Sequence, residues 1–500
     1  MPGPVFVTTT TQPRHGVFAI EQVSPAVIVP TGSDVACELG QFAWGPANVL
    51  TTPVSIKDLT NTVAPPGVDH ANSAYLGLIR KGWPTIKFVR VVASTAVVAT
   101  ANLPNAVPTQ IVRVDLKYPG IAGNSMTWTV SSASDGNALH FKLTVTATGP
   151  SGTTTDVVDN LNYSGTGADS IPVLTNALLI GAITKLVNGT PIAGTGSFAS
   201  GTTPAVISSD YVGTQGNGDK GTALLEGDST IRHFFYDDMG SSLRAAVNAG
   251  GQAHAVYMGD RVAYLNGIAG QTLAAVATDV ANYRSDRVMY LDPWVNILDD
   301  VNGTKRLVPS ASFAASVAAR LSVSTSIAWK GAEVQQMLAG INSLEADRGQ
   351  GAGSNTSNGA ATFIKETSGG FTIEADVMTQ FPVDVTHGYL TRRRVTDFIA
   401  ISFVSSTRGF VDAPNVPDNQ QNIVNALEIF MKAMKRAKDQ DPNHNPHVVD
   451  YQIGNLNAAN TQADIQNGKF SIPLDVTDSA GMRQIFLGIN SGESVVVTHT

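Results

Sequence analysis

The chain has 500 residues, more than a single hydrophobic core usually organises, so we expect about two to four compact units. Charged residues make up only 14% of it, against roughly 25% in an average soluble protein, and this deficit favours a protein whose surface is covered in an assembly. The net charge of −8 argues against a nucleic-acid binder, because binding to phosphates needs a concentrated positive field.

The sequence also lacks the signals of several other classes. Cys37 is the only cysteine, so it has no partner for an intrachain disulfide, and no Cys/His set has the spacing of a zinc site. The start, MPGPVFVTTT, has neither the basic nor the apolar region of a signal peptide. No stretch supplies the roughly 20 apolar residues of a membrane span. We therefore expect no cofactor, no bound metal and no direct membrane insertion.

The first part of the chain reads as helices that precede short apolar strands. An amphipathic run at residues 73–79 precedes the break Gly82-Trp83-Pro84 and the apolar IKFVRVV. The same order recurs where residues 241–247 lead into HAVYMG as a strand, and where apolar residues at helical spacing from 273 to 283 lead into RVMYLD. This alternation predicts a discontinuous, layered α/β central domain at residues 26–94 and 211–348.

Residues 95–210 interrupt this pattern with a segment rich in Thr, Ser, Gly and Val. In FKLTVTAT, apolar and polar residues alternate up to a turn at Gly149-Pro150, as in a half-buried strand. One helix is expected inside the segment, beginning at Asp169 and Ser170, continuing through LTNALLIGAITKLV and ending at Gly189. We therefore predict an inserted β-rich outer domain.

The rest of the chain predicts a flexible loop at residues 349–362 and a C-terminal domain at residues 363–500. FTIEADV, KFSIPLDVT and GESVVVTHT are strand candidates. The best helix in the sequence begins near Asn419, and its apolar stripe consists of Ile423, Leu427, Phe430, Met431 and Met434. The predicted fold class is α/β and α+β multidomain with extended terminal arms, the first at residues 1–25.

Both ends of the chain are short, β-prone and uncharged apart from His499. The front end contains Val5, Phe6 and Val7, and the back end contains a run of three valines, Val495, Val496 and Val497. Each end could pair within its own domain, or add a strand to a neighbouring subunit through an exposed sheet edge. Composition leaves both interpretations open.

A series of short motifs extends over nearly the whole chain. In order, they are GPAN (45–48), KGWPTIKFVRVV, YPGIAGNSMTWTV (118–130), DRVMYLDPW, VPSASFAASVAAR (308–320) with the following Trp329, TRRRVTDFIAISF (391–403) and FVDAPN (410–415) before the long helix. This order resembles the tail sheath proteins of contractile phages, pyocins and related injection systems. Two positions depart from the family pattern: Leu321-Ser322 stands where an acidic residue is common, and Ala332-Glu333 replaces a frequent Pro-Ala pair.

The resemblance implies a structural subunit and not an enzyme. Members of this family form stacked hexameric rings around an inner tube, with terminal arms that donate strands to adjacent subunits. They contract from a metastable extended state to drive the tube through the host envelope. The implied partners are other copies of the chain, the inner tail tube protein, and baseplate and tail terminator proteins. The implied location is the virion tail, after assembly in the host bacterial cytoplasm, although the sheath of a bacterial contractile injection system is an alternative.

Two basic clusters are candidates for contacts in such an assembly. The resemblance implies a tube contact in the C-terminal domain, where the polar face of the long helix ends with Lys432, Lys435 and Arg436. The alternative is a solvated face whose cations are favoured by the helix dipole. The second cluster consists of Arg392, Arg393 and Arg394, which could form salt bridges with a neighbouring subunit or pair within the chain.

Motifs of enzymatic chemistry lack their usual context. GNGDKG at residues 216–221 satisfies GxGxxG, but no apolar strand precedes it. His444 and His447 lie in a Pro/Asn-rich turn without a third ligand nearby in sequence. Asp292-Pro293 ends a predicted strand, where Pro stopping the strand is the simpler account. Two rival functions stay open: a β-rich virion adhesin or decoration protein, and a hydrolase that uses carboxylates such as Asp237/Asp238 or Asp299/Asp300.

Overall fold

The computed structural model describes residues 34–63, 65–68, 86–106, 109–149, 152–163, 174, 176–299, 304–328, 338, 340–348, 355–366, 369–410, 414–435 and 448–478. The chain divides into two compact units, which agrees with the lower end of the expected number. The larger unit is Gly32–Arg393, and the described part of the other begins at Arg394 and ends at Asp478.

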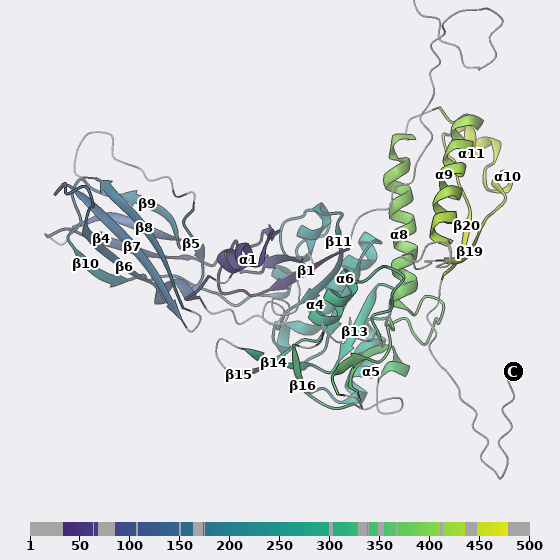
Figure 1. Ribbon diagram of the computed structural model, residues 1–500, viewed down its shortest axis with the longest axis horizontal. Coiled ribbons are helices and arrows are strands. Elements are labelled where there is room, and N and C mark those ends of the chain that lie inside the picture. Colours follow the sequence, from purple (N-terminus) through teal and green to yellow (C-terminus); the bar gives the residue numbers. More distant parts are fainter. Residues whose placement is uncertain are drawn as a thin grey trace, which may run out of the picture. The chain divides into compact units, whose positions relative to one another are not determined.

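An eight-stranded sheet forms the centre of the larger unit (Figure 1). Its six inner strands run parallel and are buried on both faces, which explains why they read as short apolar runs in the sequence. The strand order is β18-β17-β13-β12-β11-β1-β3-β2, with short antiparallel strands at both edges. The strands are β1 (Val35–Gly40), β2 (Leu50–Thr51), β3 (Ile86–Arg90), β11 (Ile231–Tyr236), β12 (Val262–Asn266), β13 (Val288–Asp292), β17 (Ala360–Lys365) and β18 (Phe371–Ile373).

Helices cover both faces of this sheet. Alternate strand residues belong to two separate core clusters, so that Phe235 packs with α6 (Ala311–Arg320), whereas Phe234 packs with α4 (Ser241–Met258) and α5 (Leu273–Asn282). Helix α6 is buried except for Arg320, and its many Ala and Ser residues allow a close approach to the strands. Two shorter helices, α1 (Ile56–Val63) and α3 (Ser208–Val212), complete the layers. The layered α/β prediction is confirmed.

Some predicted elements of this unit differ from those observed. The strands at IKFVR and VMYLD and the helix that precedes the second are confirmed as β3, α5 and β13. HAVYMG is not a strand, because α4 continues through it to Met258 and ends where Gly259 adopts a left-handed φ of 67°. The strand after this helix is β12. The helix predicted at residues 73–79 lies outside the described residues.

The inserted segment folds as two antiparallel sheets, with strand orders β10-β6-β7-β8 and β4-β5-β9. The inner faces of these sheets share one apolar cluster. Residues 141, 143, 145 and 147 of β7 are buried, as the alternation in FKLTVTAT predicts. The strands are β4 (Val98–Pro104), β5 (Gln110–Pro119), β6 (Thr127–Ser132), β7 (His140–Gly149), β8 (Gly152–Asn162), β9 (Ile180–Lys185) and β10 (Gly194–Ser197), with the short helix η1 (Ile121–Ser125) between β5 and β6.

The helix predicted in this segment is wrong for all of its described residues, because neither residues 174 and 176–179 nor the residues after them are helical. Residues 180–185 form β9, which pairs antiparallel with β5. The buried Asp156 carboxylate accepts hydrogen bonds from the backbone N–H groups of Leu178, Leu179 and Ile180, which fixes the start of this strand. Tertiary pairing therefore overrides the helical spacing of the sequence. Residues 169–173, where the helix was expected to begin, lie outside the described residues.

One buried guanidinium joins the central sheet to the inserted sheets. Arg90, at the end of β3, donates hydrogen bonds to the carbonyl oxygens of Phe42, Ala43 and Gly45 at 2.7, 3.2 and 2.8 Å. It donates a fourth, at 2.7 Å, to the carbonyl of Pro119 at the end of β5. Burial lowers the pKa of Arg90 to about 10, so the side chain stays charged near neutral pH.

The predicted domain borders remain a prediction, but the described elements do not coincide with two of them. Residues 355–358 contain the short helix η4 (Thr356–Asn358), and β17 begins at Ala360, so an ordered segment occupies the end of the loop predicted at 349–362. The border predicted at residue 363 falls inside β17. A three-stranded sheet precedes this region and consists of β14 (Val295–Asp299), β15 (Thr304–Val308) and β16 (Ile341–Leu344).

The described part of the smaller unit contains helices and one antiparallel pair of strands. Helix α8 (Leu390–Thr407) enters it from the larger unit and is followed by η5 (Arg408–Phe410) and by α9 (Pro417–Lys435), the predicted long helix. The remaining elements are β19 (Val448–Ile453), α10 (Leu456–Ala459), α11 (Gln462–Gln466) and β20 (Leu474–Asp478). Strands β19 and β20 pair with each other in a two-stranded sheet.

Candidate interaction surface

Helix α9 forms one side of the smaller unit and has the apolar stripe that the sequence predicts. Pro417 at its first position and Asp418 in its first turn are typical of a helix start. Leu427, Phe430, Met431 and Met434 are buried, while Ile423 is half-buried. The ring of Phe430 lies 6.3 Å from that of Phe398 in α8, so the stripe packs against the other long helix.

The basic residues at the end of α9 have partners within the chain. Lys432 Nζ lies 2.8 Å from Glu428 Oε1 one turn earlier, and Lys435 Nζ lies 2.6 Å from Asp450 Oδ1 in β19. Glu428 raises the pKa of Lys432, and the hydrogen bond from Lys435 lowers the pKa of Asp450. All four side chains are exposed, and such pairs contribute only about 0–1 kcal/mol each. Arg436 lies outside the described residues.

The three consecutive arginines lie in the first turns of α8 and have different surroundings. Arg393 Nη1 lies 2.9 Å from Asp286 Oδ2, which is a pairing within the chain. The guanidinium of Arg392 lies 5.8 Å from the ring centroid of Tyr389, and Arg394 is buried. Of the two predicted possibilities, pairing within the chain and pairing with a neighbouring subunit, Arg393 shows the first. The salt bridges between subunits stay a prediction.

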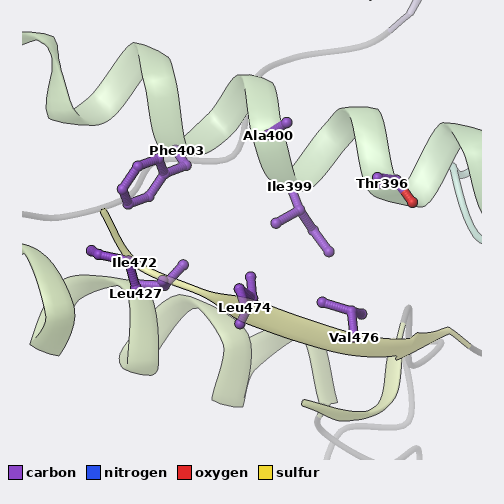
Figure 2. A pocket seen from close by; sticks show the side chains of 8 residues that line it. All are labelled: Thr396, Ile399, Ala400, Phe403, Leu427, Ile472, Leu474 and Val476. Atoms are coloured by element: carbon purple, nitrogen blue, oxygen red, sulfur yellow. The ribbon is translucent and has the colours of Figure 1, made fainter. Parts of the chain in front are cut away.

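An apolar pocket of about 370 Å³ lies between α8 and β20. In Figure 2, Ile399 of α8 points toward Leu474 and Val476 of β20, whereas Phe403 of α8 lies opposite Ile472 and Leu427 of α9. A second pocket of about 600 Å³ adjoins it through the shared lining residues Phe403 and Ile472. No residue that lines either pocket carries a charge.

Only part of this surface could be predicted from the sequence. The strand prediction for KFSIPLDVT covers β20, and its alternation of Ile472, Leu474 and Val476 marks one apolar face. The pocket itself went unrecognised, because α8 is about seventy positions away from β20 in the chain. A helical period in TRRRVTDFIAISF was the available signal for the opposite wall. The predicted strand-exchange residues Val5, Phe6, Val7, Val495, Val496 and Val497 lie outside the described residues.

The GxGxxG match at residues 216–221 is a loop with its own internal partners. The backbone N–H of Gly216 donates to the carboxylate of Glu226 at 3.0 Å. The element that follows is the 3-10 helix η2 (Gly221–Gly227), and not the α-helix that a dinucleotide site uses at the pyrophosphate. The motif therefore has neither the strand before it nor the helix after it that dinucleotide binding requires.

The described acidic residues that were candidates for catalysis in the larger unit are buried or contact an arginine of the same chain. Asp292 accepts hydrogen bonds from Arg348 Nε and Nη2 at 2.8 and 3.0 Å, and burial raises its pKa while Arg348 opposes this shift. Asp238 contacts Arg244 Nη2 at 3.3 Å, and Asp237 is buried. The side chains of Asp299 and Asp300, and the pair His444 and His447, lie outside the described residues. Among the described residues, no group of three or more His, Cys, Asp or Glu side chains could hold a metal ion.

Sequence comparison finds no relative, whereas structural comparison does. No family model and no curated protein matches the chain. The sheath tail protein of Desulfitobacterium hafniense matches with a TM-score of 0.59 and 16% identity, over 88% of this chain and 93% of that one. The sheath tail protein of Listeria innocua matches with a TM-score of 0.56 and 16% identity, over 90% and 96%. The helical sheath of the anti-feeding prophage in its contracted state gives 0.54 and 13%, over 96% and 99%.

This chain has the sheath protein fold. The multidomain α/β class predicted from the sequence is confirmed by these matches, and so is the resemblance at the level of the fold. The coverage of about nine tenths or more in each pair means that both units and the inserted sheets take part in the similarity. In the part of the chain that the structure describes, no helix has the length and hydrophobicity needed to cross a membrane.

Proposed function

We propose that this chain is the structural subunit of a contractile sheath. Copies polymerise as stacked hexameric rings around an inner tube, and the sheath contracts from a metastable extended state to drive the tube through a host envelope. The observation that carries the proposal is the sheath fold over nearly the whole chain, shared with two sheath tail proteins and with a sheath in a contracted state. A non-enzymatic role follows, since the work of such a polymer comes from two packings of the same subunits.

The sheet of the smaller unit supports strand exchange between copies. A two-stranded sheet alone is marginal in water, and among the described residues β19 and β20 pair only with each other. Their outer edges offer backbone N–H and C=O groups to an added strand. The uncharged ends with Val5–Val7 and Val495–Val497 have the composition of such strands. We propose that these ends join neighbouring subunits.

A tube contact on α9 would fit the weakness of its ion pairs. Among the described residues, Lys432 and Lys435 are exposed and pair with exposed acids, so they can exchange partners at little cost in free energy. An interface built from such pairs can hold an inner tube protein and release it during contraction. The further partners in this proposal are a baseplate and a tail terminator, and the location is a virion tail assembled in the host cytoplasm.

The matched structures leave the kind of machine open. The anti-feeding prophage sheath, with a TM-score of 0.54, is nearly as similar as the sheath tail proteins, so the sheath of a bacterial injection system is the second candidate. The two antiparallel sheets of the inserted segment are compatible with a third candidate function, a β-rich virion adhesin or decoration protein. An adhesin would stay monomeric or form small oligomers, whereas a sheath forms long tubes.

Electron microscopy of the purified full-length protein tests the proposal. Tubes or stacked rings are expected, and a protein that stays monomeric at every concentration and salt condition would contradict it. Val496→Pro should prevent polymerisation without unfolding the subunit, because proline removes a donor from an added strand. Thr500→Pro, at the last residue of the same arm, is the matched control and should polymerise normally.

A further inference from the structure

The outer face of α4 and α5 carries no charged side chain. The exposed positions of α4 are only Ser, Ala, Val and Tyr, and those of α5 are only Leu, Ala, Thr and Asn. The two Arg, Lys, Asp or Glu residues of these helices do not reach this face, since Arg244 is buried and Asp279 accepts a hydrogen bond from the buried Tyr290 hydroxyl at 2.8 Å. About 25–35% of the surface of a soluble monomer is usually charged, so this face is expected to be covered by another surface.

The face is continuous over the two helices. The Tyr283 hydroxyl donates to the carbonyl of Ala245 at 3.3 Å, and Gln252 Nε2 donates to the carbonyl of Arg284 at 3.0 Å, so α4 and α5 lie side by side. At about 1.5 Å per residue along each axis and roughly 10 Å between the axes, the two helices cover on the order of 400 Å² in projection. This is more than half of the roughly 600–800 Å² that each partner buries in a specific interface. The face is therefore large enough for the main part of one contact, with an occupant that is itself uncharged.

An uncharged loop of the same unit protrudes into solvent. Residues 49–55 read VLTTPVS and lead from β2 into α1. Val49 is 50% exposed and Val54 is 89% exposed, the highest value among the large apolar residues in the described part of the chain. The loop is held in place, because the Asp58 carboxylate accepts a hydrogen bond from the Val54 N–H at 3.0 Å and Ser55 Oγ accepts one from the Asp58 N–H at 3.1 Å. The loop is therefore a preformed apolar knob.

The helix face and the loop lie toward opposite ends of the central sheet. Strand β2, which precedes the loop, is the edge strand at one end of the strand order, whereas α5 packs on β17, the last strand but one at the other end. Two separate complementary surfaces on one subunit give a head-to-tail contact, which repeats as a ring or a helical filament. Their rims also have opposite charges, because Lys57 beside the loop and Asp238 before α4 are both exposed. The chain therefore supplies an occupant for its own face.

We propose that the α4–α5 face binds the loop at residues 49–55 of a second copy of this chain. Ala245, Ala249 and Ala253 follow one another at four-residue intervals on the exposed side of α4, so the Val54 side chain can approach this helix closely. The inference rests on the proposed function for the polymer in which the contact repeats. It uses neither the strands of the smaller unit nor the terminal arms, and is a separate connection between copies.

Thiol labelling of the full-length chain before and after assembly tests the contact. The single native cysteine, Cys37, is fully buried, so introduced thiols react selectively. We expect Ala249→Cys and Val54→Cys to react rapidly with a maleimide in the monomer and several-fold more slowly in tubes. Ala193→Cys, at an exposed position of the inserted segment, is the matched control and should react equally fast in both. Slow labelling of Ala249→Cys in the monomer would mean that the same chain covers the face, and fast labelling of either thiol in tubes would mean that the two surfaces do not meet. Each of these results overturns the proposal.

A charge placed in the face gives a second readout. Ala249→Arg should raise the protein concentration needed for tubes by about tenfold or more, because an unpaired charge is costly to bury, whereas Ala193→Arg should leave that concentration unchanged. Equal behaviour of the two variants contradicts the contact while the proposed function stands. If the unmodified protein forms no tubes, the proposed function fails, and the double variant Val54→Cys with Ala249→Cys decides the contact in concentrated solution. Disulfides between chains then support it, and their absence overturns it.

Discussion

Replacement of Arg90 by methionine should destabilise the larger unit far more than replacement of an exposed arginine such as Arg113. Arg90 is 4% exposed and donates to four carbonyl oxygens, three in the turn after β1 and one at the end of β5. Methionine fills much of the space of the aliphatic stem but leaves those carbonyls without their donor. Hydrogen bonds to a charged group contribute roughly 1.5–3 kcal/mol each, and the recovered desolvation of the guanidinium offsets part of their sum.

We therefore expect Arg90→Met to lower the free energy of unfolding by about 3–5 kcal/mol. Arg113→Met is the matched control, because Arg113 makes one exposed ion pair with Asp115 at 2.7 Å and should cost no more than about 1 kcal/mol. Urea denaturation followed by tryptophan fluorescence gives both values, since Trp44 lies in the turn that Arg90 holds. Equal effects of the two substitutions would refute the reasoning that Arg90 joins the central and inserted sheets.

Three further predictions follow from other contacts. Lys435→Glu places a negative charge beside Asp450, so sheath–tube co-assembly should weaken in pull-down assays if the tube contact lies here; unchanged co-assembly points to a solvated face. Asp292→Asn leaves the guanidinium of Arg348 without its carboxylate, and denaturation should show a loss of about 3 kcal/mol or more; a loss below about 1 kcal/mol would contradict a buried pair. Burial lowers the pKa of His254 to about 3, so between about pH 3 and pH 6.5 the unfolded chain binds a proton that the folded chain does not. In that window the free energy of unfolding should decrease as the pH is lowered, by up to about 1.4 kcal/mol per pH unit. His254→Gln should remove this component of the slope, and an unchanged slope would contradict it.

The alternation of helices and strands could be predicted from the sequence because the central sheet is parallel. Strands buried on both faces become short apolar runs, and the helices between them keep their 3.6-residue period. IKFVR and VMYLD illustrate this, since both are fully buried strands. HAVYM misled the prediction because its apolar residues are as frequent as in a strand, although in α4 only His254 and Ala255 continue the buried face of this eighteen-residue helix, and Val256 and Tyr257 are exposed.

The second error has a different cause. The apolar residues of GAITK have a spacing that suits a helix, yet the segment pairs with β5 as a strand. Just before it, the carboxylate of Asp156 accepts hydrogen bonds from three backbone N–H groups, those of Leu178, Leu179 and Ile180. A capping contact between residues more than twenty positions apart leaves no local signal in a sequence. The same holds for the pairing of Lys435 with Asp450 and for the pocket walls on α8 and β20, so the candidate surface could be predicted only as separate elements.

The contrast between the ionic contacts of the two units bears on how a contracting polymer could work. In the larger unit, the guanidinium groups of Arg90, Arg348 and Arg393 join segments distant in sequence, and the first two are largely buried. In the smaller unit, the described pairs of Lys432 and Lys435 are exposed, and an uncharged pocket lies between α8 and β20. Buried charge pairs resist rearrangement, whereas exposed pairs and apolar docking of a chain segment can form and break at a small cost. If copies of this chain slide past one another, the larger unit is therefore expected to move as a rigid body and the contacts of the smaller unit to be the ones that are exchanged.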